Sequence, residues 1–81
     1  MLGNVSITPT VALGRALRSL RLAAGLSQEQ LGLESGVQRN FISLIETGQN
    51  QPTIGTIFRL ADALKVRPSK LVADAEKLID R

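Results

Sequence analysis

The sequence predicts an all-α fold, a compact bundle of five short helices in one small domain. Apolar residues recur at intervals of three and four along most of the chain, which is the spacing of one helix face. No stretch alternates with period two over the length of a strand. The chain has 81 residues, which is room for one domain.

The composition excludes several kinds of chemistry. The chain has no Cys and no His, which excludes disulfides, thiolate or imidazole metal ligands, and Ser-His or Cys-His catalysis. The acidic side chains form no ligand-like cluster, so we expect no metal, no cofactor and no catalytic residue. No apolar run is long enough to span a membrane and no signal peptide is evident, so we expect a cytoplasmic protein. The net charge of +3 permits an anionic partner such as nucleic acid.

The chain is expected to begin with a flexible arm of residues 1–9, followed by a single domain of residues 10–81. The arm shows no helical period and contains no Lys or Arg. It therefore fits an ordinary loose terminus better than a DNA-contacting arm. The first helix of the domain is expected over residues 10–24, with Thr8 or Thr10 as its cap.

Serine and glycine mark the next two helices. Ser27 and Gln30 have the spacing of a capping box, so a helix is expected over residues 27–35, closed by a glycine with positive φ. A third helix is expected to follow at once over residues 38–47, closed by Gly48.

Two further helices complete the bundle. Thr53 is the expected cap of the fourth helix, and Pro68 suits the first position of a fifth helix within residues 67–81. The fifth helix carries an apolar strip that is wider than a four-helix core needs. We therefore expect two copies of the chain to form a homodimer through this helix. The members of the strip are Leu71, Val72, Ala75, Leu78 and Ile79. The alternative is that the first two complete the core and the last two fray.

The second and third helices, joined by a turn of about three residues, have the layout of a helix-turn-helix unit. The surrounding motifs are Arg-x-x-x-Gly-Leu-Ser-Gln at 21–28, Leu-Gly at 31–32, Ser-Gly-Val at 35–37, Ile-Ser-x-Ile-Glu-x-Gly at 42–48, Pro-Thr-Ile at 52–54 and Leu-Ala-x-Ala-Leu at 60–64. With these motifs in this order, residues 13–72 resemble the Xre family of phage-repressor and Cro-like proteins. The resemblance implies a lambda-repressor-like DNA-binding domain.

The resemblance also implies that helix 38–47 enters the major groove of double-stranded DNA. Gln38, Arg39 and Asn40 lie at its N-terminal end and are the expected base readers, because Arg can bridge guanine and Asn or Gln can bridge adenine. Phe41 is expected either against a thymine methyl or in the core. The other expected DNA contacts are Gln28, Ser43, Thr47 and Asn50, and Gln51 and the helix start at Thr53 are expected beside a phosphate.

An ion pair between Arg21 and Glu46 is implied by the same resemblance and is expected to be structural. Two features depart from the family pattern. Gly32 stands where Ala is frequent, and residues 49–51 read Gln-Asn-Gln where Lys or Arg is common. Few cations then face the DNA, so we expect binding to depend only moderately on salt.

The function expected from these features is that of a sequence-specific transcriptional regulator. We expect a repressor that binds an inverted repeat as a homodimer. The alternative is an antitoxin or another protein-interaction module, with a protein partner such as a toxin, in which DNA binding is accessory. In that case exposed apolar residues such as Leu22 and Leu33 would carry the function.

Overall fold

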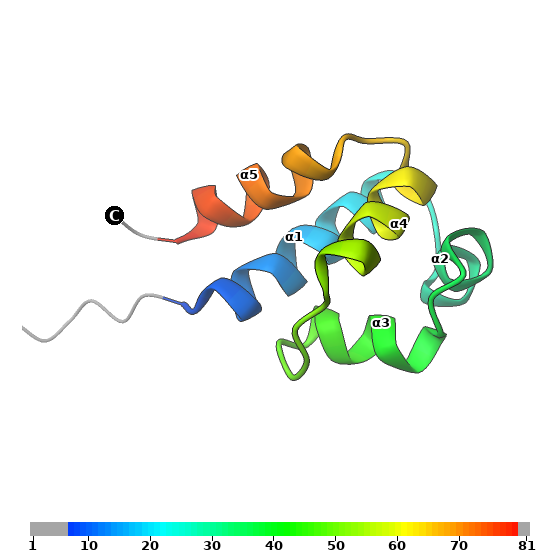
Figure 1. Cartoon of the computed structure of the whole chain (residues 1–81), viewed down its shortest axis with the longest axis horizontal. Coiled ribbons are helices and arrows are strands. Elements are labelled where there is room, and N and C mark those ends of the chain that lie inside the picture. The colour runs from blue at the N-terminus through cyan, green and yellow to red at the C-terminus, as the bar shows by residue number, and fades with distance from the viewer. Residues whose placement is uncertain (1–6, 80–81) are drawn as a thin grey trace, which may run out of the picture.

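The computed structural model describes residues 7–79 and shows five α-helices and no strand within that range, which confirms the all-α fold. The helices are α1 (Pro9–Ala23), α2 (Gln28–Ser35), α3 (Arg39–Glu46), α4 (Ile54–Leu64) and α5 (Pro68–Leu78). In Figure 1, α1 and α5 lie side by side and α3 lies on the other side of α1. The fourth helix packs against α2 and α5. None of these five helices is long and apolar enough to cross a membrane.

Side-chain caps hold the starts of α1 and α2. Oγ1 of Thr8 accepts from the Val11 amide at 3.2 Å, which makes Thr8, and not Thr10, the cap of α1. The capping box of α2 is complete. Oγ of Ser27 accepts from the Gln30 amide at 3.0 Å, and Oε1 of Gln30 accepts from the Ser27 amide at 2.8 Å. These local signals explain why both helices begin within one residue of the predicted positions.

Residues with a left-handed backbone conformation follow four of the helices. Gly25, Gly36 and Gly48 close α1, α2 and α3 with φ between 74 and 77°, as glycine permits. The fourth helix ends differently, because Lys65 takes φ 60° and ψ 39° there and donates its amide to the Asp62 carbonyl at 3.0 Å. A side chain makes this conformation costly, by about 1–2 kcal/mol.

Aliphatic side chains from all five helices form one core. The largest fully buried side chains are Leu17, Leu31, Ile42, Ile45, Leu60 and Leu71. On α5, Leu71 is 1% exposed and Ala75 is 6% exposed, so both belong to the core of their own chain. This burial leaves little of either side chain for a second copy to contact. Val72 and Leu78, by contrast, remain about half exposed, and Ile79 packs in part against the core.

Two glycines lie where backbones come close together. A Cβ atom on Gly14 would stand 2.1 Å from the carbonyl oxygen of Ile45, so α1 and α3 are in direct backbone contact at this point. A Cβ atom on Gly32 would stand 2.9 Å from the carbonyl oxygen of Val37. The close approach of the turn to α2 gives a physical reason for glycine at position 32.

The expected N-terminal arm of residues 1–9 lies mostly outside the described residues. The part that is described belongs to the folded domain. Ile7 packs against the core, Thr8 caps α1, and Pro9 is the first residue of that helix. The domain therefore begins no later than residue 7.

Candidate nucleic-acid interface

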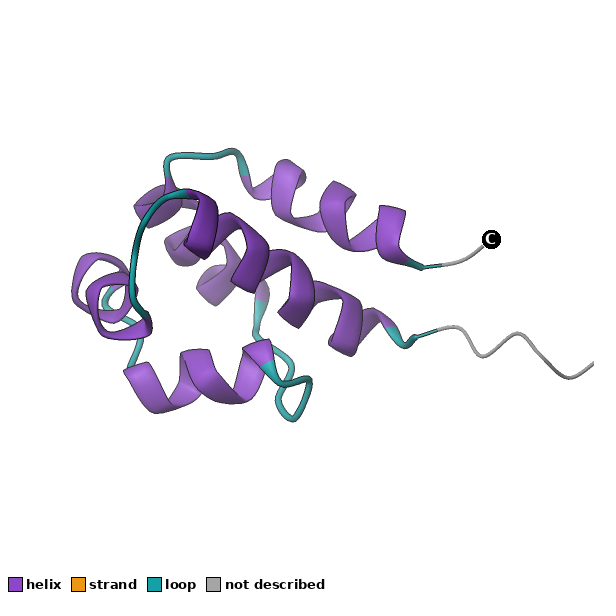
Figure 2. Ribbon diagram, turned by 180° about the vertical axis from the view of Figure 1, so that it is seen from behind, coloured by secondary structure: helices purple, strands orange, loops and turns teal. Residues whose placement is uncertain are grey.

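The third helix lies at the edge of the molecule with one face held in the core. Ile42 and Ile45 are completely buried, and they fix the rotation of the helix about its axis. Gln38, Arg39 and Asn40 are exposed at its N-terminal end. Figure 2 shows from behind that α3 lies on the far side of the molecule from the loop joining α4 and α5. The three expected base readers therefore share one accessible end of a rigidly held helix.

A buried ion pair ties the end of α3 to the end of α1. Nε of Arg21 lies 2.6 Å from Oε2 of Glu46, and Nη2 of Arg21 lies 2.9 Å from Oε1. The two side chains are only 8% and 2% exposed. Nη1 of Arg21 also donates to the Leu26 carbonyl at 2.8 Å. The hydrogen bond to Glu46 raises the pKa of Arg21 above its ordinary value, against the opposing effect of burial.

The side chain of Gln28 joins this cluster. Its Nε2 donates to Oε1 of Glu46 at 3.0 Å, and the side chain is partly buried. The sequence predicted Gln28 as a phosphate contact and did not indicate this partner. Its amide has two N–H groups, so the bond to Glu46 leaves one of them for a further acceptor.

Local side-chain hydrogen bonds stabilise the C-terminal end of α3. Oγ1 of Thr47 donates to the Ser43 carbonyl at 2.9 Å and accepts from Nε2 of Gln49 at 3.0 Å. The single hydroxyl hydrogen of Thr47 is therefore engaged within the helix, which disfavours Thr47 as a phosphate donor. Ser43 and Asn50 are partly buried, and the Asn50 amide donates to the Leu44 carbonyl at 3.2 Å.

Phe41 and the exposed arginines of α1 and α3 are the remaining candidates for contact with DNA. Phe41 is partly buried and packs against the core, which agrees with the second of its two expected roles. Arg39 is exposed on α3, and Arg15 and Arg18 are exposed on α1. Among the described residues no group of His, Cys, Asp and Glu could hold a metal ion.

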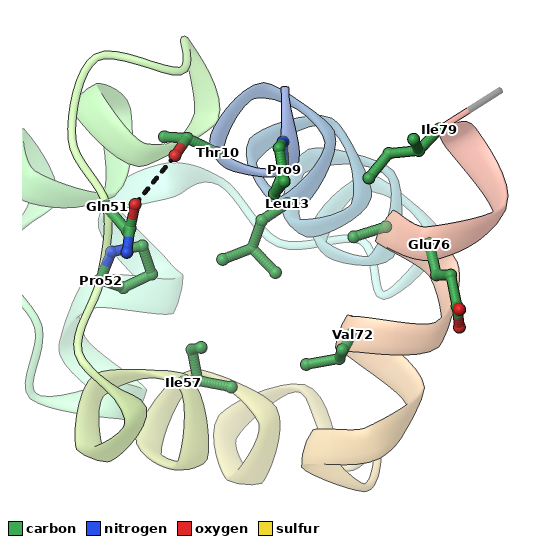
Figure 3. Close-up of a pocket in the computed structure, with 10 residues that line it drawn as sticks. Pro9, Thr10, Leu13, Gln51, Pro52, Ile57, Val72, Glu76 and Ile79 are labelled. Atoms are coloured by element: carbon green, nitrogen blue, oxygen red, sulfur yellow. Dashed lines mark hydrogen bonds between the residues drawn. The ribbon is translucent and has the colours of Figure 1, made fainter. Parts of the chain in front are cut away.

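A groove of about 470 Å³ lies between α1, α4 and α5 (Figure 3). Leu13, Ile57 and Val72 point into it from the three helices. None of the DNA contacts expected on α2 and α3 lines this groove, and Gln51 of the loop after α3 lies at its edge. The polar end of α3 and the apolar groove are therefore separate surfaces.

Comparison with known proteins agrees with this geometry. A helix-turn-helix family model, HTH_3, matches residues 17–71. An HTH-type transcriptional regulator of Sinorhizobium fredii is 34% identical over 64 residues, covering 79% of this chain and 83% of the relative. The control protein C.BamHI of Bacillus amyloliquefaciens is 35% identical over 60 residues, covering 73% of this chain and 74% of the relative.

Solved structures give the same result. The restriction-modification controller protein C.AhdI from Aeromonas hydrophila aligns with a TM-score of 0.75 and 42% identity, covering 76% of this chain and 94% of that one. The clp gene regulator ClgR from C. glutamicum aligns with a TM-score of 0.88 over 94% of this chain and 97% of that one, and at 24% identity it supports the fold alone. The chain therefore belongs to the HTH_3 helix-turn-helix family of DNA-binding transcriptional regulators.

Proposed function

We propose that this regulator recognises a specific DNA sequence by placing the N-terminal end of α3 in the major groove. The observation that carries the proposal is the exposure of Gln38, Arg39 and Asn40 on a helix whose other face is fully buried. Their side chains match the donor and acceptor patterns of guanine and adenine in that groove. The burial of the other face of α3 matters because base contacts depend on hydrogen-bond donors that are held in place.

The proposed active form is a homodimer on an inverted repeat. One α3 helix spans too few base pairs for a selective site, and two related helices would read half-sites about 34 Å apart. The sequence predicted a dimer contact on α5, but two of its five residues are buried within the chain. The proposed contact lies on four of the apolar side chains that are exposed in the single chain. These are Ile54 and Phe58 of α4 with Val72 and Leu78 of α5.

We further propose that the protein acts as a repressor of genes near its binding site. The resemblance to restriction-modification control proteins supports a role in controlling gene expression. Run-off transcription from a promoter that overlaps the site tests this proposal. Less transcript with added protein is expected, whereas more transcript would indicate an activator.

The sequence-specific reading is tested by selection from a random pool of DNA duplexes. We expect enrichment of an inverted repeat with half-site centres one helical turn apart. Enrichment of a single, unrepeated site would contradict the dimer. No enrichment by folded protein would contradict sequence-specific binding and would direct attention to a protein partner.

A further inference from the structure

The groove between α1, α4 and α5 has apolar walls that stay partly open to solvent. Val72 is 49% exposed, and Leu13 and Ile79 are only partly buried. At the rim, Oγ1 of Thr10 donates to Oε1 of Gln51 at 3.0 Å (Figure 3). These two polar side chains engage each other, so an occupant of the groove gains free energy chiefly by burying apolar surface.

The groove lies at the end of the molecule where the chain enters the fold. Its lining includes Pro9, the first residue of α1, and Ile79, which directly follows α5. Figure 1 shows the start of α1 and the end of α5 at the same end of the molecule. Residues 1–6 precede Ile7, the first described residue, which packs against the core. This short segment is therefore tethered directly beside the groove.

The sequence of residues 1–6 suits an apolar groove. It contains Met1, Leu2 and Val5 and no charged side chain. An extended chain spans at most about 3.3–3.6 Å per residue, so Val5 can lie up to about 7 Å from Ile7 and Leu2 up to about 17 Å. Side chains two positions apart on an extended chain share a face. An extended segment would therefore turn Val5 toward the same side as Ile7, which packs on the core.

A tethered occupant has an advantage over a separate molecule. A short linker gives the segment an effective concentration in the millimolar range, whereas a second copy has to bind from dilute solution. Ordering the segment offsets much of the free energy gained by burying its apolar side chains. Docking is therefore expected to be weak and reversible, and to change measured rates by a few-fold.

We propose that residues 1–6 dock in the groove of their own chain and cover Val72. Because Val72 also belongs to the proposed dimer contact, the docked segment competes with a second copy for this side chain. That consequence rests on the proposed function, whereas the docking itself does not. The homodimer then forms only from chains whose segment has left the groove, and its apparent affinity is reduced by the docked fraction.

The test measures the accessibility of the groove by cysteine labelling, since the chain has no Cys of its own. Val72→Cys is made together with Phe58→Asp, which keeps a second copy from covering the groove. The rate of reaction with dithionitrobenzoate is compared with and without Leu2→Ser/Val5→Ser. We expect the change in the segment to speed labelling by about threefold. Ala73→Cys is the control, because Ala73 is exposed outside the groove and should label equally in both backgrounds.

A second control keeps the composition of the segment. Asn4→Ser/Ser6→Asn exchanges its polar residues, retains its apolar side chains and should label like the native segment. Equal labelling of Val72→Cys with the native segment and with Leu2→Ser/Val5→Ser would overturn the docking.

Sedimentation of chains with the native Phe58 tests the competition. We expect Leu2→Ser/Val5→Ser to dimerise about threefold more tightly than wild type. Weaker dimerisation would place the segment on the partner copy and overturn the proposal. A chain that stays monomeric at every concentration but keeps the labelling difference would contradict the proposed homodimer and support the docking.

Discussion

Removing the carboxylate of Glu46 should strongly destabilise the protein. In Glu46→Ala the guanidinium of Arg21 stays buried, with its side chain only 8% exposed, and loses both carboxylate oxygens at 2.6 and 2.9 Å. The Nε2 donor of Gln28 loses its acceptor as well. Breaking one side of a buried pair costs about 3–5 kcal/mol, which is a large share of the roughly 5–15 kcal/mol that a native protein has.

Urea denaturation measures this loss of free energy. It is followed by far-ultraviolet circular dichroism, because a chain without Trp or Tyr has little intrinsic fluorescence. In a thermal melt, the expected fall in melting temperature is at least about 12 °C, taking about 4 °C per kcal/mol for a domain of this size. The matched control is Asp74→Ala, which breaks the more exposed Lys70–Asp74 pair at 3.2 Å and should change stability by less than about 0.5 kcal/mol. A loss below about 1 kcal/mol in Glu46→Ala would show that the buried Arg21 guanidinium does not need the Glu46 carboxylate.

The double variant Arg21→Leu/Glu46→Leu examines the cause of that loss. It removes both charges, so neither is left buried without a partner. We expect it to be more stable than Glu46→Ala, because apolar replacement of a buried pair is often neutral. Equal instability of the two proteins would indicate that packing, and not the uncompensated charge, sets the cost.

Gly14→Ala should lower the free energy of unfolding by at least about 2 kcal/mol, because the new Cβ would stand 2.1 Å from the Ile45 carbonyl oxygen. The control Gly55→Ala should be neutral or stabilise by up to about 0.5 kcal/mol. Thermal melts compare the two variants. Lys65→Gly should stabilise by about 1 kcal/mol by removing the strain at φ 60°, and an unchanged melting temperature would contradict that strain. Phe58→Asp should leave the chain folded but shift it toward monomer in sedimentation, with Asp62→Asn as the exposed control on α4. With about two to three phosphates neutralised per subunit, the dimer should show a log–log salt slope near −4 to −5, and a slope steeper than about −8 would contradict so small a count.

The parts of the fold that depend on neighbours in sequence could be predicted. Ser27 and Gln30 are three residues apart, and their capping box forms as their chemistry requires. The glycines at positions 36 and 48 close their helices for the same local reason. Lys65 shows the limit, because nothing in its own chemistry favours a left-handed conformation, and the path from α4 to α5 imposes it.

The parts that depend on distant partners could not be predicted from periodicity. The apolar strip of α5 marked Leu71 and Ala75 as buried, but periodicity does not say whether the burial is against α1 or against a second copy. Gln28 could be placed at the start of a helix, yet its bond to Glu46 joins residues 18 positions apart. The resemblance to a family did supply the Arg21–Glu46 pair, since that pairing comes with the shared fold.

Whether the N-terminal end of α3 reads bases is tested by comparing Arg39→Ala with Arg67→Ala on the enriched duplex and on random-sequence DNA. Both changes remove one exposed arginine, but Arg67 directly precedes α5. Figure 1 shows the loop between α4 and α5 on the far side of the molecule from α3. If α3 reads bases, Arg39→Ala should lower the ratio of specific to non-specific affinity by at least about tenfold, in line with about 1–3 kcal/mol for a bidentate base contact. Arg67→Ala should leave the ratio unchanged. Equal ratios in Arg39→Ala and wild type would contradict the claim that the N-terminal end of α3 carries the specificity.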